Sequence, residues 1–167
     1  MEGKAYHTLF DTGPDGAALA RNLDSLQIDV GAVDRIVLSH WHRDHSGGIL
    51  EFLKRRRGAA SQITVDMHPS RPFARGIAPP PTFDKIMARL PEDPSFLEIE
   101  ALGAVVDKRD EGHVVQGDTV FVSGEIPRVI EWERGLLGGV RWIPYEGAEK
   151  GDVQGEWISE PVSTIVL

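Results

Sequence analysis

A short segment near residue 40 joins an apolar run to a dense group of polar side chains. Arg35 to Leu38 is apolar apart from its first residue, and His40, His42, Asp44 and His45 follow within a few positions. An apolar run without polar alternation is typical of a strand in a sheet whose faces are covered by helices. The segment therefore predicts a buried strand that ends in a loop of metal-ligand side chains.

The spacing of these side chains indicates a metal site. Residues two apart on a strand share a face, so His40 and His42 could bind one ion. After the loop turns, Asp44 and His45 could face a neighbouring position. Imidazole nitrogens with one carboxylate suit zinc, and iron or manganese less selectively. The alternative is a polar loop with histidines at the surface, but the alternating spacing before a helix favours the metal site.

Length and composition narrow the class of protein. The 167 residues suffice for one domain with a core, and the formal net charge of −8 argues against a nucleic-acid surface. The absence of cysteine excludes disulfides and thiolate metal sites. Neither an apolar signal segment at the start nor a long apolar run later is present. We expect a cytoplasmic protein that takes a small-molecule substrate, without a nucleic-acid or membrane partner, and nothing indicates an oligomer.

The first part of the chain reads as alternating strands and helices, the opening of an α/β sandwich. Strands are expected at 6–10, 35–39 and 63–67. Asp15 should cap a helix whose apolar stripe contains Leu19, Leu23 and Leu26. Ser46 should cap the next helix, which ends at Gly58.

The later part is less regular. Residues 70–95 read as an inserted loop or lid in a single domain over 1–167, with a Pro- and Gly-rich stretch at 71–82 and a short helix at 83–90. Strands are expected near 96–99, 113–115 and 119–123. From Gly135 onward an extended loop is expected, ending in a strand-like tail over 161–167.

Several motifs resemble a known family. The pattern His40-x-His42-x-Asp44-His45 after a strand, with Phe10-Asp11-Thr12-Gly13 upstream, is similar to the metallo-β-lactamase fold superfamily. The segment Ser123 to Arg128, with Glu133-Arg134-Gly135 soon after, resembles the branch of the ribofuranosylaminobenzene 5′-phosphate synthases. The resemblance extends from about Thr8 to Val162, and His68-Pro69 and residues 155–161 also fit it.

The resemblance implies an αββα sandwich with two metal ions, zinc in the first instance, at the edge of the sheets. His40 and His42 would bind the first ion, and Asp44 with His45 the second. The ions would activate water, and Asp44 could also handle a proton. Asp11 would brace the motif by contacting a ligand histidine, although a turn-capping role explains this residue equally well. Arg128 is expected to form a salt bridge with a nearby glutamate rather than to contact an anion.

The same resemblance implies that part of the ligand set is missing. Full-length relatives carry further metal-binding histidines in a second half, and we expect this chain to be truncated before them. His7, His68 and His113 lie outside any ligand motif: His68 should be packed, and the other two solvated. The sequence thus supports two hypotheses, a metal-dependent hydrolase or transferase acting on a small anionic substrate, or a truncated non-catalytic fragment with a structural or regulatory role. A third is a fragment that pairs with another chain.

Overall fold

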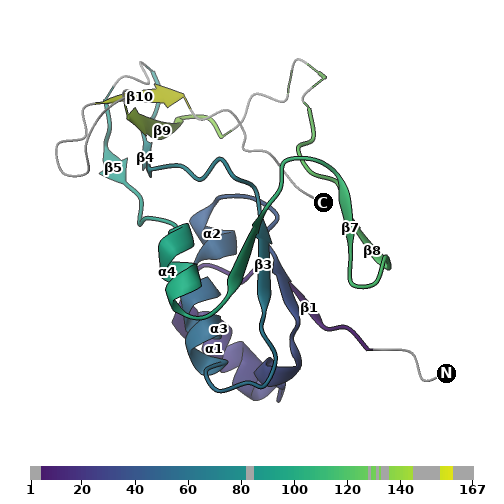
Figure 1. Ribbon diagram of the computed structural model, residues 1–167. Helices are drawn as coiled ribbons and strands as arrows, with labels where there is room; N and C mark the ends of the chain where they lie inside the picture. Colours follow the sequence, from purple (N-terminus) through teal and green to yellow (C-terminus); the bar gives the residue numbers. More distant parts are fainter. Residues whose placement is uncertain are drawn as a thin grey trace. The chain divides into compact units, whose positions relative to one another are not determined.

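The computed structural model describes residues 5–81, 85–127, 129–130, 132, 136–144 and 155–159. The chain forms two compact units (Figure 1). The first consists of Met1–Pro69, Pro94–Ile126 and Thr164–Leu167, and the second of Ser70–Asp93 and Pro127–Ser163. Among the described residues, no helix has the length and apolarity to cross a membrane.

A parallel four-stranded sheet organises the first unit. Its apolar strands are short and β-branched, as buried parallel strands usually are. The spatial order is β1 (Thr8–Phe10), β2 (Arg35–Val37), β3 (Thr64–Met67) and β6 (Val105–Lys108). The first three strands confirm the prediction, whereas β6 was not anticipated.

Helices cover one face of this sheet, as Figure 1 shows. Alternation along the strands turns Ile36 and Val65 toward the helices, and both are 0% exposed. Phe52 and Ile99 meet them from the helical side in one apolar core. The helices are α1 (Gly16–Ser25), α3 (Ile49–Arg55) and α4 (Phe96–Ala101).

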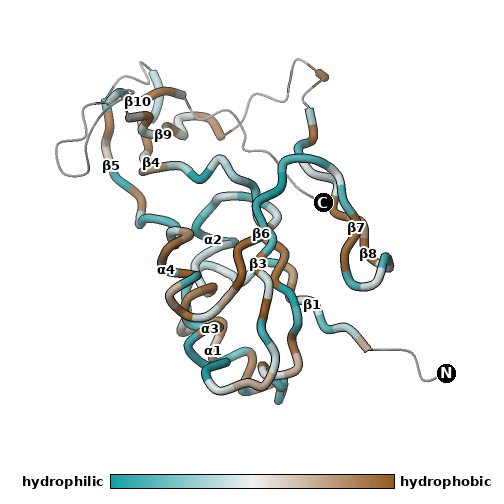
Figure 2. Tube along the Cα trace, in the orientation of Figure 1, coloured by the Kyte–Doolittle hydropathy of each residue, from teal (hydrophilic) through white to brown (hydrophobic). Residues whose placement is uncertain are grey.

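A hairpin packs on the opposite face of the sheet. Its strands β7 (His113–Val115) and β8 (Val120–Val122) confirm the strands predicted there, and they pair antiparallel. Val37 of β2 forms a small buried cluster with Val115 and Val122. Figure 2 shows apolar residues along both strands of the hairpin.

The start of α1 confirms the predicted cap, but its end differs. The carboxylate of Asp15 accepts a hydrogen bond from the backbone N–H of Ala18 at 2.8 Å. Leu23 is buried, as expected for the apolar stripe. Leu26 is 70% exposed, because the helix ends at Ser25 and the residue lies beyond the packed turns.

The helix predicted to follow a cap at Ser46 begins later than that cap implies. A one-turn helix, α2 (Arg43–Ser46), ends at that residue, and α3 begins after Gly48. A Cβ atom at Gly47 would lie 2.0 Å from the carbonyl oxygen of Pro14, and one at Gly48 2.3 Å from that of Thr12. The two glycines therefore let the segment around Thr12 approach the helix start, and they take the place that a serine cap would have had.

Residues 96–99 form the start of α4, so the strand predicted there is wrong. Ser95 and Glu98 form a capping box, in which each side chain accepts from the other residue's backbone N–H. The apolar residues Phe96 and Ile99 are three apart and reach the core on one helical face. The capping signature outweighs the apolar character of the segment, which suggested a strand.

The second unit contains an antiparallel sheet that the sequence did not predict. Its order is β10 (Gly155–Ser159), β9 (Gly139–Pro144), β4 (Ala74–Ile77) and β5 (Ala88–Arg89). The strand β4 lies in the stretch expected to be a loop, and β5 in the segment expected to be a helix. Glycine was read as a sign of a loop, but Gly76 is required because a Cβ atom there would lie 2.8 Å from the carbonyl oxygen of Ala88 and 3.2 Å from the ring of Trp157. The tail predicted at 161–167 lies outside the described residues.

Candidate metal centre

The predicted ligands follow the carboxyl end of β2. The loop after this strand holds His40 and His42, and the one-turn helix α2 holds Asp44 and His45. The three histidines are half-buried, whereas the side chain of Asp44 is 70% exposed.

The structure brings the three imidazoles together. The ring centroid of His40 lies 4.6 Å from that of His42 and 4.0 Å from that of His45. Asp44 is beside this group, since its Oδ2 atom lies 3.4 Å from Nε2 of His45. We call these four residues the histidine cluster. Their assignment as metal ligands stays a prediction.

Asp11, at the end of β1, connects the first strand to the histidine cluster. Its Oδ2 atom accepts a hydrogen bond from Nδ1 of His45 at 2.7 Å. Its two carboxylate oxygens also accept from the backbone N–H of Ser39 at 2.8 Å and from the Ser39 hydroxyl at 2.7 Å. Asp11 has a φ of 58°, a left-handed conformation that aspartate tolerates better than most residues. These contacts are those of a residue that braces the motif loop.

Ser39 is a site residue that the sequence analysis did not single out. Its Oγ atom lies 3.0 Å from Nδ1 of His40 and 3.2 Å from Nδ1 of His45. Because the hydroxyl donates its hydrogen to Asp11, it can accept one from a ring N–H of His40. Its position directly before the first histidine, and the hydroxyl it carries, were the available signal.

Backbone contacts hold the loop from the other side. The backbone N–H and the hydroxyl of Thr12 both donate to the carbonyl oxygen of His45, at 2.7 and 2.8 Å. The Thr12 hydroxyl oxygen accepts in turn from the N–H of Gly48 at 3.2 Å. Thr12 is 2% exposed, so these bonds are protected from water. These hydrogen bonds therefore hold the backbone of the loop that carries the three histidines.

The electrostatic setting keeps one imidazole neutral. Burial lowers the pKa of His40 to about 4, and the neighbouring His45 and His42 act in the same direction. Neutral imidazole is the form that binds a metal ion. His40 is therefore in its ligand-competent form at neutral pH.

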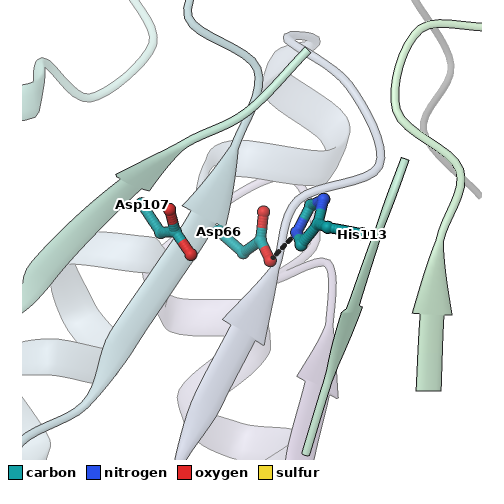
Figure 3. Close-up of side chains that lie close together, drawn as sticks. All are labelled: Asp66, Asp107 and His113. Carbon is teal, nitrogen blue, oxygen red and sulfur yellow. Dashed lines mark hydrogen bonds and ion pairs between the residues drawn. The ribbon is translucent and has the colours of Figure 1, made fainter. Parts of the chain in front are cut away.

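A second group of potential ligands lies on the hairpin side of the sheet. Asp66 of β3, Asp107 of β6 and His113 of β7 bring ligand atoms within 4.8 Å of one another (Figure 3). Nε2 of His113 lies 2.8 Å from Oδ2 of Asp66, and the His113 side chain is only 11% exposed. The expectation that His113 is solvated is therefore wrong, because the hairpin turns it onto the sheet. We call these three residues the Asp/His group, and they could hold a metal ion.

Arginines already neutralise the Asp/His group. Nη1 of Arg35 lies 2.8 Å from Oδ2 of Asp66 and 3.4 Å from Oδ2 of Asp107. Nε of Arg109 lies 3.0 Å from Oδ1 of Asp107. A metal ion at this position would have to displace the Arg35 guanidinium, so the histidine cluster offers the better donor set.

The other histidines agree with their predicted environments. His68 is 6% exposed, and its carbonyl oxygen accepts from the indole N–H of Trp41 at 2.7 Å. Nε2 of His68 lies 3.8 Å from Oε2 of Glu125. His7 is exposed. Arg128, predicted to pair with a nearby glutamate, lies outside the described residues.

A curated protein of known name is similar in sequence to this chain. A synthase from Methanocaldococcus jannaschii, "7,8-dihydropterin-6-methyl-4-(beta-D-ribofuranosyl)-aminobenzene-5'-phosphate synthase", is 33% identical over 122 residues, which are 71% of this chain and 38% of the synthase. The chain thus spans well under half the length of this curated relative.

Two solved structures also resemble the chain. The Rm3 metallo-beta-lactamase matches 86% of this chain and 49% of its own, with 19% identity and a TM-score of 0.47. The metallo-beta-lactamase MIM-1 from Novosphingobium pentaromativorans matches 99% of this chain and 55% of its own, with 19% identity and a TM-score of 0.44. Residues 1–149 match the sequence model of the metallo-beta-lactamase superfamily, so the chain belongs to this superfamily.

Proposed function

We propose that the chain is a metal-dependent hydrolase or transferase that acts on a small anionic substrate, with zinc held by His40, His42, Asp44 and His45. One observation carries this proposal. The Nδ1 atoms of His40 and His45 are engaged by Ser39 and Asp11, which leaves the Nε2 atoms of both rings as the metal-binding nitrogens.

The donor set fits the group it would hold. Three imidazoles and one carboxylate are the hard and borderline ligands that zinc accepts, with iron or manganese as alternatives. His40 needs no deprotonation at neutral pH, because its pKa is lowered to about 4. When bound, such an ion acts as a Lewis acid toward substrate oxygens and toward water.

The protein side chains have separate tasks in this proposal. Asp11 and Ser39 fix the orientation of the rings through the contacts described above. Asp44 is exposed and lies at 3.4 Å from Nε2 of His45, so it can also accept or deliver a proton at its carboxylate. The relative's name, a 5′-phosphate synthase, supports an anionic substrate and a transferase as one of the two reaction classes.

The second candidate is a non-catalytic fragment of such an enzyme, with a structural or regulatory role at most. The observation in its favour is the size of the donor set, because the histidine cluster offers four ligand side chains. Catalytic zinc sites ordinarily have three protein ligands and one open position, and the histidine cluster would give two ions only two ligands each. Such a chain would bind metal weakly and turn over no substrate.

Metal analysis together with an activity screen separates the two candidates. The purified chain is loaded with Zn²⁺, and bound metal is quantified by mass spectrometry for the native chain, for His42→Ala and for His7→Ala, which changes an exposed histidine elsewhere. The screen uses phosphate mono- and diesters and lactones. Metal retained by the native chain and by His7→Ala, with turnover that His42→Ala abolishes, supports the enzyme. Metal without turnover, or the loss of metal from the native chain, supports the non-catalytic alternative and contradicts the enzyme.

A further inference from the structure

The second unit contains a cleft whose lining is cationic and aromatic. Its volume is about 350 Å³. One wall is formed by the segment 70–73, which leads into β4, and the other by the three residues Arg141–Ile143 of β9. All of these residues belong to the second unit, so the cleft is complete without the histidine cluster.

Two arginines face each other across the strands that carry this cleft. Arg141 of β9 stands directly opposite Arg75 of β4 in the antiparallel register. Like charges in this arrangement destabilise a strand pair unless a counter-charge intervenes. Asp93 supplies one, because its Oδ2 atom lies 3.0 Å from a guanidinium nitrogen of Arg75, and both side chains are almost fully buried.

Arg141 is left without such a counter-charge among the described residues. Its Nε atom is buried, and within the described part of the chain it has no hydrogen-bond partner. Across the sheet, the neighbouring strand places Ile158 opposite Arg141, and Glu156 is two register pairs away, opposite Ile143. A buried N–H without an acceptor is costly, so the position favours an acceptor that comes from outside the chain.

The remaining lining is suited to a flat apolar group. Phe73 and Trp142 line the cleft together with the arginine, and Pro72 and Ile143 complete the apolar surface. The Trp142 ring is held edge-on against Trp157, with 5.4 Å between the ring centroids. Arg71, which also lines the cleft, donates to the carbonyl oxygen of Asp93 and adds positive charge. The positive charge of the cleft lining contrasts with the net charge of −8 of the whole chain.

We propose that this cleft binds a small molecule that carries an oxyanion on an aromatic ring. The planar guanidinium of Arg141 presents paired N–H donors, which match the oxygens of a carboxylate or a phosphate. The aromatic walls pack against the ring. The volume is at the lower end of the range for ligand pockets, which fits a single-ring compound. This inference does not depend on the proposed metal centre.

Nuclear magnetic resonance of the arginine Nε–H groups tests the proposal directly. The full chain, labelled with ¹⁵N-arginine, is titrated separately with benzoate, phenyl phosphate, benzamide and inorganic phosphate. We expect the Arg141 signal to shift saturably with benzoate or phenyl phosphate. The compound that binds more tightly shows whether the cleft prefers a carboxylate or a phosphate. Benzamide and inorganic phosphate should each bind at least tenfold more weakly, because one lacks the charge and the other the ring.

Matched variants locate the site. Arg141→Gln should weaken binding at least tenfold, whereas Arg21→Gln, which changes an exposed arginine on α1, should leave it unchanged. Arg141→Lys keeps the charge and the length but not the planar fork, and it serves if the glutamine variant fails to fold. The proposal is overturned by the absence of saturable shifts, by equal binding of benzamide, by equal binding of inorganic phosphate, or by unchanged binding in a folded Arg141 variant.

Discussion

Nδ1 of His45 lies 2.7 Å from Oδ2 of Asp11, although 34 residues separate them in the sequence. The contact joins the end of the first strand to the one-turn helix that follows the second. A carboxylate bonded to the far nitrogen of a ligand histidine fixes the ring and makes it a stronger base. The structural position of Asp11 therefore leads to the first prediction.

Asp11→Asn should weaken Zn²⁺ binding by about 10- to 100-fold, the range typical for partners of ligand histidines. The amide keeps the size of the side chain but loses the charge that His45 contacts. Competition with a chromophoric chelator measures the affinity. Asp15→Asn, at the cap of α1, is the matched control and should bind Zn²⁺ as the native chain does. Equal affinity of both variants would contradict the role of Asp11.

Ser39→Ala should destabilise the chain by about 1 kcal/mol, because the buried hydroxyl bridges Asp11 and the ring of His40. Zn²⁺ affinity should fall as well, since the His40 ring loses its acceptor. Ser39→Thr restores the hydroxyl and should recover most of both losses. Urea unfolding and the chelator assay give the two measurements. A loss of stability without any loss of affinity would reduce Ser39 to a structural residue.

The metal-free chain should lose stability as the pH falls from about 6.5 toward 4. The pKa of His40 is about 4 in the folded chain and 6.5 in its ordinary state, so between these values the unfolded chain binds the proton preferentially. Below pH 4 this contribution becomes constant. His45, His42, Asp11 and Asp44 face the ring, and their charges act on the pKa of His40. The difference between native and His40→Asn unfolding curves, recorded with chelator present, isolates the contribution of His40. Parallel curves would argue against it.

The two groups of potential ligands can be told apart by single substitutions. If the metal binds the histidine cluster, His113→Ala should retain the metal content of the native chain, whereas His42→Ala should lose it. The reverse result would place the ion in the Asp/His group. Zn²⁺ content after dialysis against a weak chelator provides the measurement.

Arg35 should matter more to stability than Arg109, although both pair with the Asp/His group. Arg35→Met removes the cation beside Asp66, whose side chain is 3% exposed, and should cost about 3 kcal/mol. Arg109→Met changes a side chain that is 52% exposed, and its effect should stay within about 1 kcal/mol. Chemical denaturation of both variants provides the comparison. Similar losses would show that burial does not set the strength of these pairs.

The sequence predicted the parts of the fold that depend on local patterns. The strands near Ile36 and Val65 were found because buried parallel strands are continuous apolar runs. The cap at Asp15 was found because its geometry involves only neighbouring residues. The strands of the second unit were missed because they are rich in Gly and Arg, and their stability comes from pairing with distant segments.

The candidate site, too, has features that local sequence predicts and features that depend on distant contacts. The histidine cluster was visible because its members lie within a few residues. The hydroxyl of Ser39 and the pairing of His113 with Asp66 were not, because they depend on which strands become neighbours. Such contacts are consequences of topology rather than of spacing.

The left-handed backbone of Asp11 constrains how this position could change. Glycine or asparagine would suit a φ of 58°, but neither offers the charge that His45 contacts. Glutamate would keep the charge, but it is less at ease in that conformation and its longer side chain would overshoot Ser39. Among the twenty amino acids, aspartate alone meets both requirements. A substitution at this one residue would therefore change the backbone turn or the charge beside His45.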